Sequence, residues 1–306
     1  DLHSFPTRRS SDLHIDLTLC GWLLDQRGHH GARPSFGRYG QDHVPIKEQR
    51  TIEGHAVRAA FLFNGVTHYV GATGDQDYRN AVLAVWEDLV ERKMYLHGAT
   101  GNLSARNEGY RRNPYCILPD DAYGESCAVF ANFQWAHSLS RLTGEARYLD
   151  TAERLLYNAF AAALSLRGDS SFYCNAAQSD PKDEIAKIPY PYPRSSQLAA
   201  GCCPPNIVKL TNKVGGFFYS TRPDGIDVNH YGASEAWVPW RSGIRITQQT
   251  AYPWSGEITL RIASKRPEHF TLRLRLPDWA KSYQLAINGR PIAYMEIGRA
   301  SCRERV

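Results

Sequence analysis

Sulfur-containing residues are scarce in this chain, which has 2 methionines and 7 cysteines among its 306 residues. So low a cysteine density excludes a small disulfide-rich scaffold. The sequence also lacks any run of about 18 apolar residues, the length that spans a bilayer, so membrane insertion is not expected. No block of lysines and arginines resembles a nucleic-acid-binding arm, and the formal net charge of +5 is spread along the chain. The composition is that of an ordinary globular protein, and the chain is long enough for more than one domain.

Both ends of the chain differ from its interior. The opening DLHSFPTRRSSDL and the closing EIGRASCRERV resemble translated sequencing-adapter sequence, a kind of addition that is set apart before a fold is inferred. We therefore expect residues 1–13 and 297–306 to be artefactual and six cysteines to belong to the native part. An even number of cysteines permits disulfides, but their low density favours a reducing compartment. The localisation, cytoplasmic or periplasmic, stays unknown.

Two segments in the first part of the chain repeat the same plan. Residues 55–93 and 126–164 each contain an apolar helical pattern, then Thr-Gly and an acidic residue, then a tyrosine that opens a second helix. Gly74 and Gly144 would supply the left-handed C-cap conformation, and the acidic residue favours the next helix N-terminus. Each segment therefore predicts a helical hairpin, and recurring hairpins are typical of solenoids or closed toroids. One face of the second helix is predicted to be apolar: Tyr78, Ala81, Val82, Val85, Trp86, Leu89 and Val90.

After about residue 225 the pattern changes from helical to alternating. Short stretches at 243–254, 256–264, 269–279 and 283–292 alternate apolar and polar residues, as half-buried strands do. The third is predicted to turn Phe270, Leu272, Leu274 and Leu276 to a core and Thr271, Arg273 and Arg275 to water. Asn288-Gly289 indicates a hairpin, whose second strand would run into the adapter-like tail. We expect a mainly α fold with a second all-β domain: a helical domain at 14–222 and an incomplete β-sandwich at 223–296.

Three cysteines and a glutamate stand at the predicted starts of two helices. Glu125 and Cys127 lie in GESC, and Cys202 and Cys203 lie in GCCPPN. One carboxylate and three thiolates make a four-ligand set for which zinc is the natural ion. Prolines suit the first helical turn, and the positive end of the helix dipole is expected to lower the pKa of thiols there. Plain burial, or a disulfide between the adjacent cysteines, stays open, since no CxxC pair supports a metal site.

Six motifs together resemble those of one enzyme family. YGQDHVPIKEQRTIEGHAVRA, LPDDAYGESCA, AERLLYNAF, GCCPPN, TAYPW and LRLRLPDW occur in the order typical of glycoside hydrolase family 127, the β-L-arabinofuranosidase group. The resemblance implies a partial (α/α)6 barrel followed by a truncated β-sandwich, with early barrel helices missing from this chain. It also implies a bound zinc ion (Zn2+) and retaining hydrolysis by a cysteine nucleophile. The implied substrate is a carbohydrate, an arabinose-containing or pectic plant glycan.

The resemblance also assigns roles to single residues. Glu125, Cys127, Cys202 and Cys203 match the family's zinc ligands, and Cys202 also matches its nucleophile. A zinc-bound thiolate stays deprotonated and becomes a better leaving group in the second step, which suits this role. Four further positions match residues that line the sugar pocket: His43, His55, Glu153 and Tyr173. Without the resemblance, the two histidines would be interpreted as structural and Glu153 as a solvated helix residue.

One position departs from the family pattern. Characterised members carry a Gly-Glu pair before the LP turn, in which the glutamate is the general acid/base, but counting back from Leu118 places Tyr110 there. Tyr110 is then expected to face the substrate, and Glu108 is the nearest carboxylate and the candidate acid/base. The alternatives are an acid from elsewhere or a leaving group that needs no strong protonation. Loss of the acid would cost on the order of 10²- to 10⁴-fold in the rate on an alkyl glycoside.

Two other functions stay open from the sequence. A closed four-ligand zinc site is normally structural, so a non-catalytic glycan-binding protein is one alternative. A helical repeat protein with unmetallated thiols, used for protein contacts, is the other. Neither nucleic acid nor membrane is an expected partner, and a homodimer stays open.

Overall fold

The computed structural model describes most of the chain, in eight stretches: 10–31, 34–105, 108–178, 194–196, 201–239, 243–267, 269–292 and 299–305. Residues 1–9, most of the adapter-like opening segment, and residues 297, 298 and 306 of the closing one lie outside them. The chain divides into two compact units. The first runs to Thr143 and resumes over Thr151–Thr211, and the second contains Gly144–Asp150 and Asn212–Val306.

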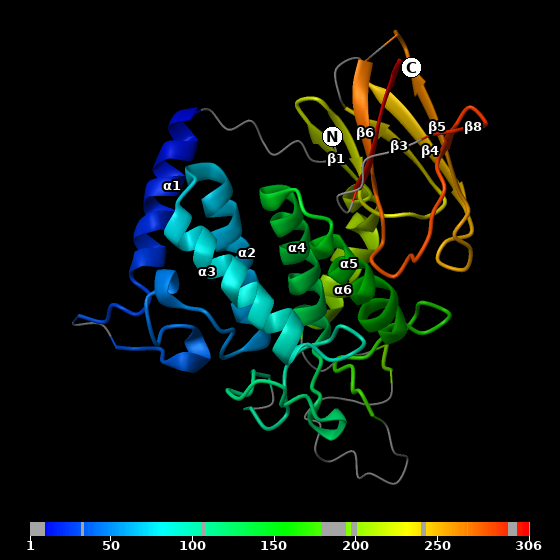
Figure 1. The fold of residues 1–306 in the computed structure, drawn as a ribbon. Coiled ribbons are helices and arrows are strands. Elements are labelled where there is room, and N and C mark those ends of the chain that lie inside the picture. Colours follow the sequence, from blue (N-terminus) through cyan, green and yellow to red (C-terminus); the bar gives the residue numbers. More distant parts are fainter. Residues whose placement is uncertain are drawn as a thin grey trace. The chain divides into compact units, whose positions relative to one another are not determined.

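Helices form most of the first unit (Figure 1). The α-helices of the chain are α1 (Ser10–Asp25), α2 (Ala56–Thr73), α3 (Gln76–Asp88), α4 (Ser126–Thr143), α5 (Arg147–Arg154) and α6 (Cys203–Lys213). Two of them continue as π-helical turns, α3 into η3 (Leu89–Lys93) and α5 into η5 (Leu155–Phe160). Single 3₁₀ turns are η1 (Arg38–Gly40), η2 (Ile46–Glu48), η4 (Pro119–Asp121), η6 (Ala161–Ala163) and η8 (Val214–Phe217). Within the described residues, no helix is both long and apolar enough to cross a membrane.

The predicted helix breaks are confirmed at their glycines. α2 ends at Gly74, whose φ of 74° is left-handed, and Asp75 then caps α3 by accepting the backbone amides of Asp77 and Tyr78. Gly144, with φ of 82°, follows the end of α4 in the same conformation. Because each break combines a residue that tolerates positive φ with an acidic residue before the next helix, the chain reverses at the predicted points.

The apolar faces of three helices meet in an aromatic core. α2 packs against both α3 and α4. Trp135 of α4 stacks on Phe63 of α2 with ring centroids 5.6 Å apart, and meets Trp86 of α3 edge-on at 4.9 Å. The predicted face of α3 is buried except for Val90, which is half-buried: Tyr78, Ala81, Val82, Val85, Trp86 and Leu89. This core fixes the N-terminal ends of α2 and α4, from which the candidate site is built.

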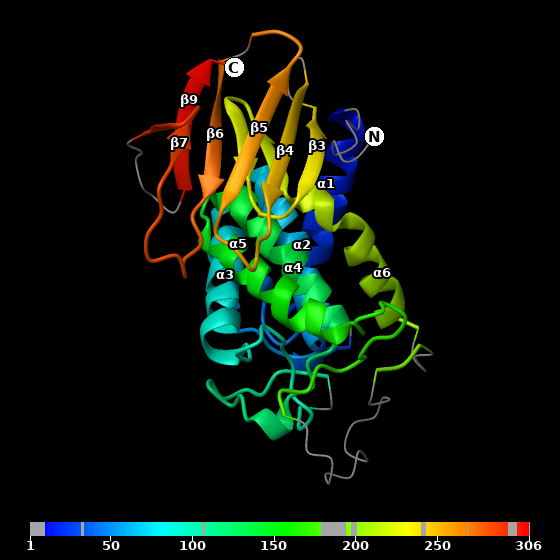
Figure 2. The same ribbon diagram turned by 90° about the vertical axis from the view of Figure 1, so that its right-hand side faces the viewer.

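A small β domain forms most of the second unit (Figure 2). One sheet has the order β1-β2-β6-β9, with β1 (Tyr219–Arg222), β2 (Gly225–Val228), β6 (His269–Arg275) and β9 (Arg299–Arg305). The other is antiparallel, with β3 (Ser234–Val238), β4 (Ile244–Thr250) and β5 (Ile258–Ser264). Both sheets contribute to one hydrophobic core: Ile226, Val238, Ile244, Ile246 and Phe270. Helices followed by a small β domain are therefore the architecture, as the sequence predicted.

The Asn288-Gly289 hairpin is confirmed, but its second strand does not run into the tail. Asn288 and Gly289 have φ of 51° and 78°, as a type I′ turn requires. The turn joins β7 (Ala286–Ile287) to β8 (Arg290–Pro291), which ends before the adapter-like segment. Residues 299–305 of that segment instead pair with β6 as β9.

Two strand residues predicted to face water are buried, Thr271 with 5% exposure and Arg275. Arg275 of β6 has 0% exposure, so both predictions were wrong. Its Nη1 lies 2.6 Å from Oδ1 of Asp150, and its Nε donates to the carbonyl of Asn229 at 2.7 Å. The simple alternation fails at Arg275 because an ion pair and a hydrogen bond replace the water that a guanidinium otherwise needs.

Candidate active site

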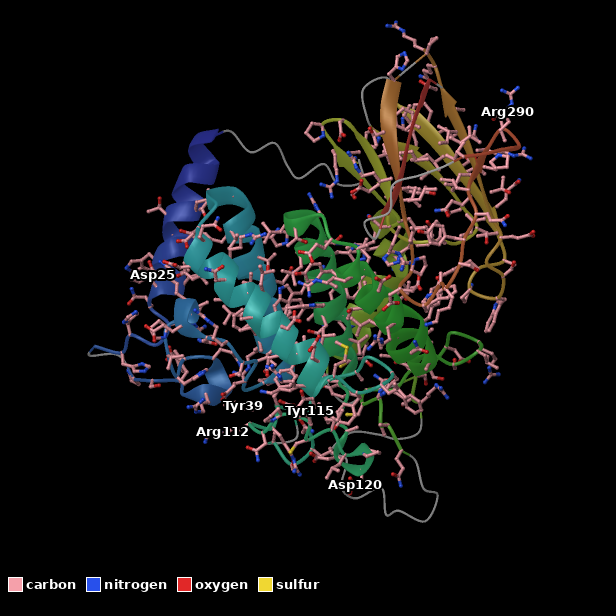
Figure 3. The ribbon with its side chains drawn as sticks, viewed as in Figure 1. Asp25, Tyr39, Arg112, Tyr115, Asp120 and Arg290 are labelled. Carbon is pink, nitrogen blue, oxygen red and sulfur yellow. The ribbon has the colours of Figure 1, made fainter. Side chains whose placement is uncertain are left out.

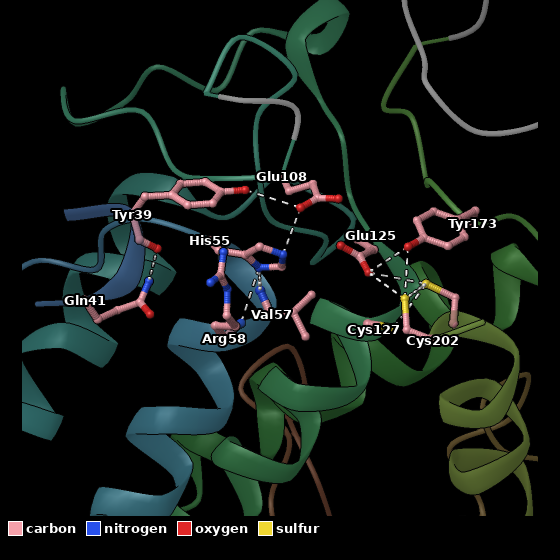
Figure 4. A network of polar contacts seen from close by, with 11 residues as sticks. Tyr39, Gln41, His55, Val57, Arg58, Glu108, Glu125, Cys127, Tyr173 and Cys202 are labelled. Carbon is pink, nitrogen blue, oxygen red and sulfur yellow. Dashed lines mark hydrogen bonds and ion pairs between the residues drawn. The ribbon is translucent and has the colours of Figure 1, made fainter. Parts of the chain in front are cut away.

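The N-terminal ends of α4 and α6 meet in a cluster of donor atoms (Figure 4). Glu125 directly precedes α4 and Cys127 lies in its first turn, whereas Cys203 begins α6 and Cys202 directly precedes it. One carboxylate oxygen and the three sulfurs lie within 4.8 Å of one another. The structure therefore brings together the four residues that the sequence selected as metal ligands.

The spacing within this Glu/Cys cluster excludes the adjacent disulfide. The sulfurs of Cys202 and Cys203 are 4.0 Å apart, about twice the length of a disulfide bond, roughly 2.05 Å, and the described cysteines are all free. Glu125 Oε1 lies 3.6 Å from Cys202 Sγ and 3.5 Å from Cys203 Sγ. Glu125 Oε2 is buried with no hydrogen-bond partner among the described residues. A buried carboxylate with one unpartnered oxygen and three nearby sulfurs together form a donor set that can hold a metal ion.

The three thiols differ in their exposure. Cys127 and Cys203 are buried, with 1% and 0% exposure, whereas Cys202 is exposed. Only Cys202 therefore offers its sulfur to a molecule from solution.

The expectation that the helix ends would lower the pKa of every thiol was wrong for two of them. Burial raises the pKa of Cys202 to about 11. The pKa of Cys203 is raised by its contact with Cys127 and by burial, whereas that of Cys127 is lowered, chiefly by the same contact. Without a cation, desolvation at Cys202, and the contact with Cys127 together with desolvation at Cys203, outweigh the positive helix ends.

Two polar side chains contact the sulfurs from outside the cluster. The Tyr173 hydroxyl lies 3.0 Å from Cys202 Sγ and donates to Glu125 Oε1 at 3.4 Å, so this predicted pocket residue lies at the cluster. Asn206 Nδ2 donates to Cys127 Sγ at 3.2 Å. Asn206 lies within the GCCPPN motif, but no role was predicted for it from the sequence. Its position three residues after Cys203 was the available signal, because that spacing places both side chains on one helix face.

His55 and Glu108 form a second polar group next to Glu125. A ring nitrogen of His55 and one carboxylate oxygen each of Glu108 and Glu125 lie within 4.8 Å of one another. His55 caps α2 in an unusual way, because its Nδ1 accepts the backbone amides of Val57 and Arg58 at 3.2 and 3.4 Å. An accepting Nδ1 leaves the proton on Nε2, which lies 2.9 Å from Glu108 Oε2. The helix start therefore fixes the tautomer that donates to Glu108.

Tyr39 supplies a second donor to the same glutamate. Its hydroxyl donates to Glu108 Oε2 at 3.3 Å, and its ring lies edge-on to His55 with centroids 5.7 Å apart. Burial lowers the pKa of His55 and raises that of Tyr39, so both side chains are neutral donors near neutral pH. Because both bonds go to Oε2, the carboxyl group is oriented with Oε1 left for another partner.

The three other predicted pocket residues, Tyr110, Glu153 and His43, are buried or half-buried. Tyr110 is buried and its hydroxyl donates to Thr100 Oγ1 at 3.3 Å. Glu153 is buried in α5, with 7% exposure, so it is not a solvated helix residue, and it belongs to neither group of candidate ligands. His43 has a buried Nδ1 without a hydrogen-bond partner among the described residues, and burial lowers its pKa.

Family models match both parts of the chain. The model described as "Beta-L-arabinofuranosidase, GH127 catalytic domain" matches residues 17–216, and the GH127 middle-domain model matches residues 225–300. The chain belongs to glycoside hydrolase family 127.

Relatives of known sequence and structure agree with this membership. A non-reducing end β-L-arabinofuranosidase of Bifidobacterium longum subsp. longum is 31% identical over 259 residues, which cover 83% of this chain and 39% of that protein. The crystal structure of a family 127 β-L-arabinofuranosidase from Geobacillus stearothermophilus T6 is 28% identical, with a TM-score of 0.86 over 95% of this chain and 49% of that one. A second β-arabinofuranosidase structure of the family gives 30% identity and a TM-score of 0.84 over 94% of this chain and 46% of that one. The chain thus spans about half or less of the length of these relatives.

Proposed function

We propose that this chain carries the active site of a zinc-dependent retaining glycoside hydrolase, with Cys202 as nucleophile and Glu108 as general acid/base. The substrate proposed is a terminal β-L-arabinofuranosyl residue or a related plant-glycan sugar, as the names of the relatives suggest. We further propose that residues 14–222 form part of an (α/α)6 barrel and residues 223–296 an incomplete β-sandwich. One observation carries the proposal: an exposed thiol in the Glu/Cys cluster lies in one continuous polar group with an oriented carboxyl group.

Donor distances in the Glu/Cys cluster support zinc as the ion. Four ligands placed tetrahedrally around zinc are separated by about 3.8 Å between sulfurs and about 3.6 Å between sulfur and oxygen. Cys202 and Cys203 are 4.0 Å apart, and Glu125 Oε1 lies 3.5 and 3.6 Å from these sulfurs. The sulfurs of Cys127 and Cys203 are 3.1 Å apart, which is closer than the separation of about 3.8 Å expected for two sulfurs on one zinc ion. When bound, zinc would keep the thiols as thiolates at neutral pH, despite the raised pKa of Cys202.

Residues of this chain then divide the reaction into two steps. Cys202 Sγ attacks the anomeric carbon, the carbon–sulfur bond forms, and the glycosidic carbon–oxygen bond breaks as Glu108 gives its proton to the leaving oxygen. Glu108 next takes a proton from water, whose oxygen displaces the sulfur and returns the thiolate. Two inversions retain the configuration of the sugar. His55 and Tyr39 hold Glu108 through Oε2, so Oε1 is the oxygen proposed to carry the proton.

Replacement of the two reacting groups tests the proposal. In this chain, Cys202→Ser should abolish release of arabinose from an alkyl β-L-arabinofuranoside, and Glu108→Ala should lower the rate by about 10²- to 10⁴-fold. The Glu108→Ala loss should be much smaller on a 4-nitrophenyl glycoside, whose leaving group needs little protonation. The matched controls are Cys20→Ser, at an exposed thiol outside the cluster, and Glu91→Ala, at an exposed carboxylate of η3.

The alternative glycan-binding function predicts a different result. About one zinc per chain together with no sugar release from any substrate would indicate a structural metal site, as a closed four-donor set also permits. Full activity of Cys202→Ser would refute the nucleophile. Equal losses for Glu108→Ala on both substrates would refute its role as the acid.

A further inference from the structure

A cavity of about 740 Å³ lies next to the candidate acid/base, within the first unit. Its lining includes Tyr39, which donates to Glu108, and Gly54 and Gly109, which are sequence neighbours of His55 and Glu108. Neither the three thiols of the Glu/Cys cluster nor Tyr173 are among its lining residues in the described part of the chain, although Cys116 is. The cavity therefore adjoins Glu108 without including the Glu/Cys cluster.

Arginines give this cavity its chemical character. Among the described lining residues, Arg38, Arg111 and Arg112 are basic and Glu53 is the one acidic residue. Arg38 is neutralised, because its Nη1 lies 2.9 Å from both carboxylate oxygens of Glu53. Arg111 is also paired, because its Nε lies 2.8 Å from Oδ2 of the largely buried Asp121.

Arg112 is the guanidinium in this cavity that has no ion-pair or hydrogen-bond partner among the described residues. It is exposed and lines the cavity together with Tyr39; both residues are labelled in Figure 3. A guanidinium presents several N–H donors in a planar fork that matches a carboxylate or a sulfate. The cavity is thus suited to a negatively charged group.

We propose that this cavity binds an anionic group on the sugar that leaves, a uronate carboxylate or a sulfate ester, with Arg112 as its main contact. The inference rests on the proposed function in one respect, the role of Glu108. A general acid faces the leaving group, and the nucleophile attacks from the opposite side of the anomeric carbon. Tyr39 and the Cys202 sulfur lie on opposite sides of Glu108 (Figure 4). The cavity beside Tyr39 is therefore on the leaving-group side.

Direct binding tests the proposal without requiring activity. Methyl β-D-glucuronoside should bind this chain at low ionic strength about tenfold or more tightly than its neutral methyl ester, as expected for charge-assisted hydrogen bonds. Arg112→Met should reduce binding of the acid to that of the ester, and Arg112→Lys should retain part of it. Galactose 6-sulfate, compared with galactose, tests the sulfate ester as the other source. Titration calorimetry or ligand-observed NMR gives the affinities.

Controls separate this inference from the proposed function. Arg167→Met removes an exposed arginine outside the cavity lining and should leave binding unchanged. Equal affinity for acid and ester, together with equal affinity for the sulfated and neutral sugar, would overturn the inference even if the enzyme releases arabinose. Undiminished binding by Arg112→Met would also overturn it. Acid-selective binding that Arg112→Met removes would uphold the site even in a chain without hydrolase activity, in which case the proposed function would fail alone.

Discussion

Two adjacent thiols at the start of α6 differ because the helix turns one of them inward. Cys203, the first residue of α6, is fully buried, whereas Cys202 remains exposed beside the Tyr173 hydroxyl. Spacing offered both thiols, with Glu125 and Cys127, as one candidate ligand set beside plain burial or a disulfide, and the family resemblance favoured the ligand set. Spacing could not tell which thiol serves only as a metal ligand and which is also the nucleophile, because exposure depends on how α4 and α6 pack. The family resemblance supplied that distinction, and the difference in exposure supports it.

The side-chain amide of Asn206 is expected to strengthen zinc binding by the Glu/Cys cluster. Its hydrogen bond to Cys127 Sγ stabilises sulfur as a thiolate and orients it. Asn206→Ala should weaken zinc binding by about 10- to 100-fold, as is typical of residues that hydrogen-bond a metal ligand. Competition with a chromogenic chelator measures the affinity. Asn158→Ala is the control, because it removes an exposed amide that, among the described residues, donates to the carbonyl of Arg154. Equal affinities of the two variants would contradict the prediction.

A histidine in place of the usual Ser, Thr, Asp or Asn caps α2, and this links the helix to the site. The cap requires an unprotonated Nδ1, because an imidazolium has no acceptor. Burial outweighs the neighbouring Glu108 and, together with Arg58, holds the pKa of His55 below its usual value. The neutral ring can therefore cap α2 and donate to Glu108 at the same time.

The cap of α2 should therefore make stability depend on pH. The folded state holds the pKa of His55 below the unfolded value of about 6.5, so folding is favoured by this group above that pH. Its contribution is lost as the pH falls from about 6.5 through the lower, folded pKa. Thermal unfolding from pH 8 to pH 5 should show a loss of about 1 kcal/mol, the size of an N-cap. His55→Asn, which caps without titrating in this range, should remove this component, and an unchanged pH profile in that variant would show that another group is responsible.

Local patterns predicted the helical hairpins well and the long loop between them poorly. Gly74, Gly144 and Asp75 act through their own backbone conformation or the next few amides, so their effect is visible in the sequence. The loop that carries Glu108 is instead fixed by distant backbone bonds, from the Ala56 amide to the Glu108 carbonyl and from the Tyr110 amide to the Gly54 carbonyl. No local pattern encodes that register. Counting residues therefore left Glu108 and Tyr110 undecided, whereas the structure places Glu108 against His55 and Tyr110 against Thr100.

Across the whole molecule, residues far apart in the chain meet inside the second unit. A buried ion pair joins Asp150, in the first turn of α5, to Arg275, the last residue of β6. The alternation of β6 predicted Arg275 at the surface, since a strand pattern carries no information about a partner 125 residues away. Burial raises the pKa of Asp150 and Arg275 opposes this rise. The pair is therefore needed for both groups to stay charged away from water.

Removal of Arg275 should destabilise the chain far more than removal of an exposed arginine. Arg275→Met leaves a buried, unpaired carboxyl group and should lower the free energy of unfolding by about 3–5 kcal/mol. Arg261→Met, on the exposed face of β5, should change it by less than about 0.5 kcal/mol. Adding Asp150→Asn to Arg275→Met should restore part of the loss, because the orphaned charge is then gone. Urea unfolding followed by circular dichroism gives the free energies of the parent chain, Arg275→Met, Asp150→Asn, the double variant and the Arg261→Met control. Additive losses of Arg275→Met and Asp150→Asn in the double variant would mean that the ion pair contributes no coupling.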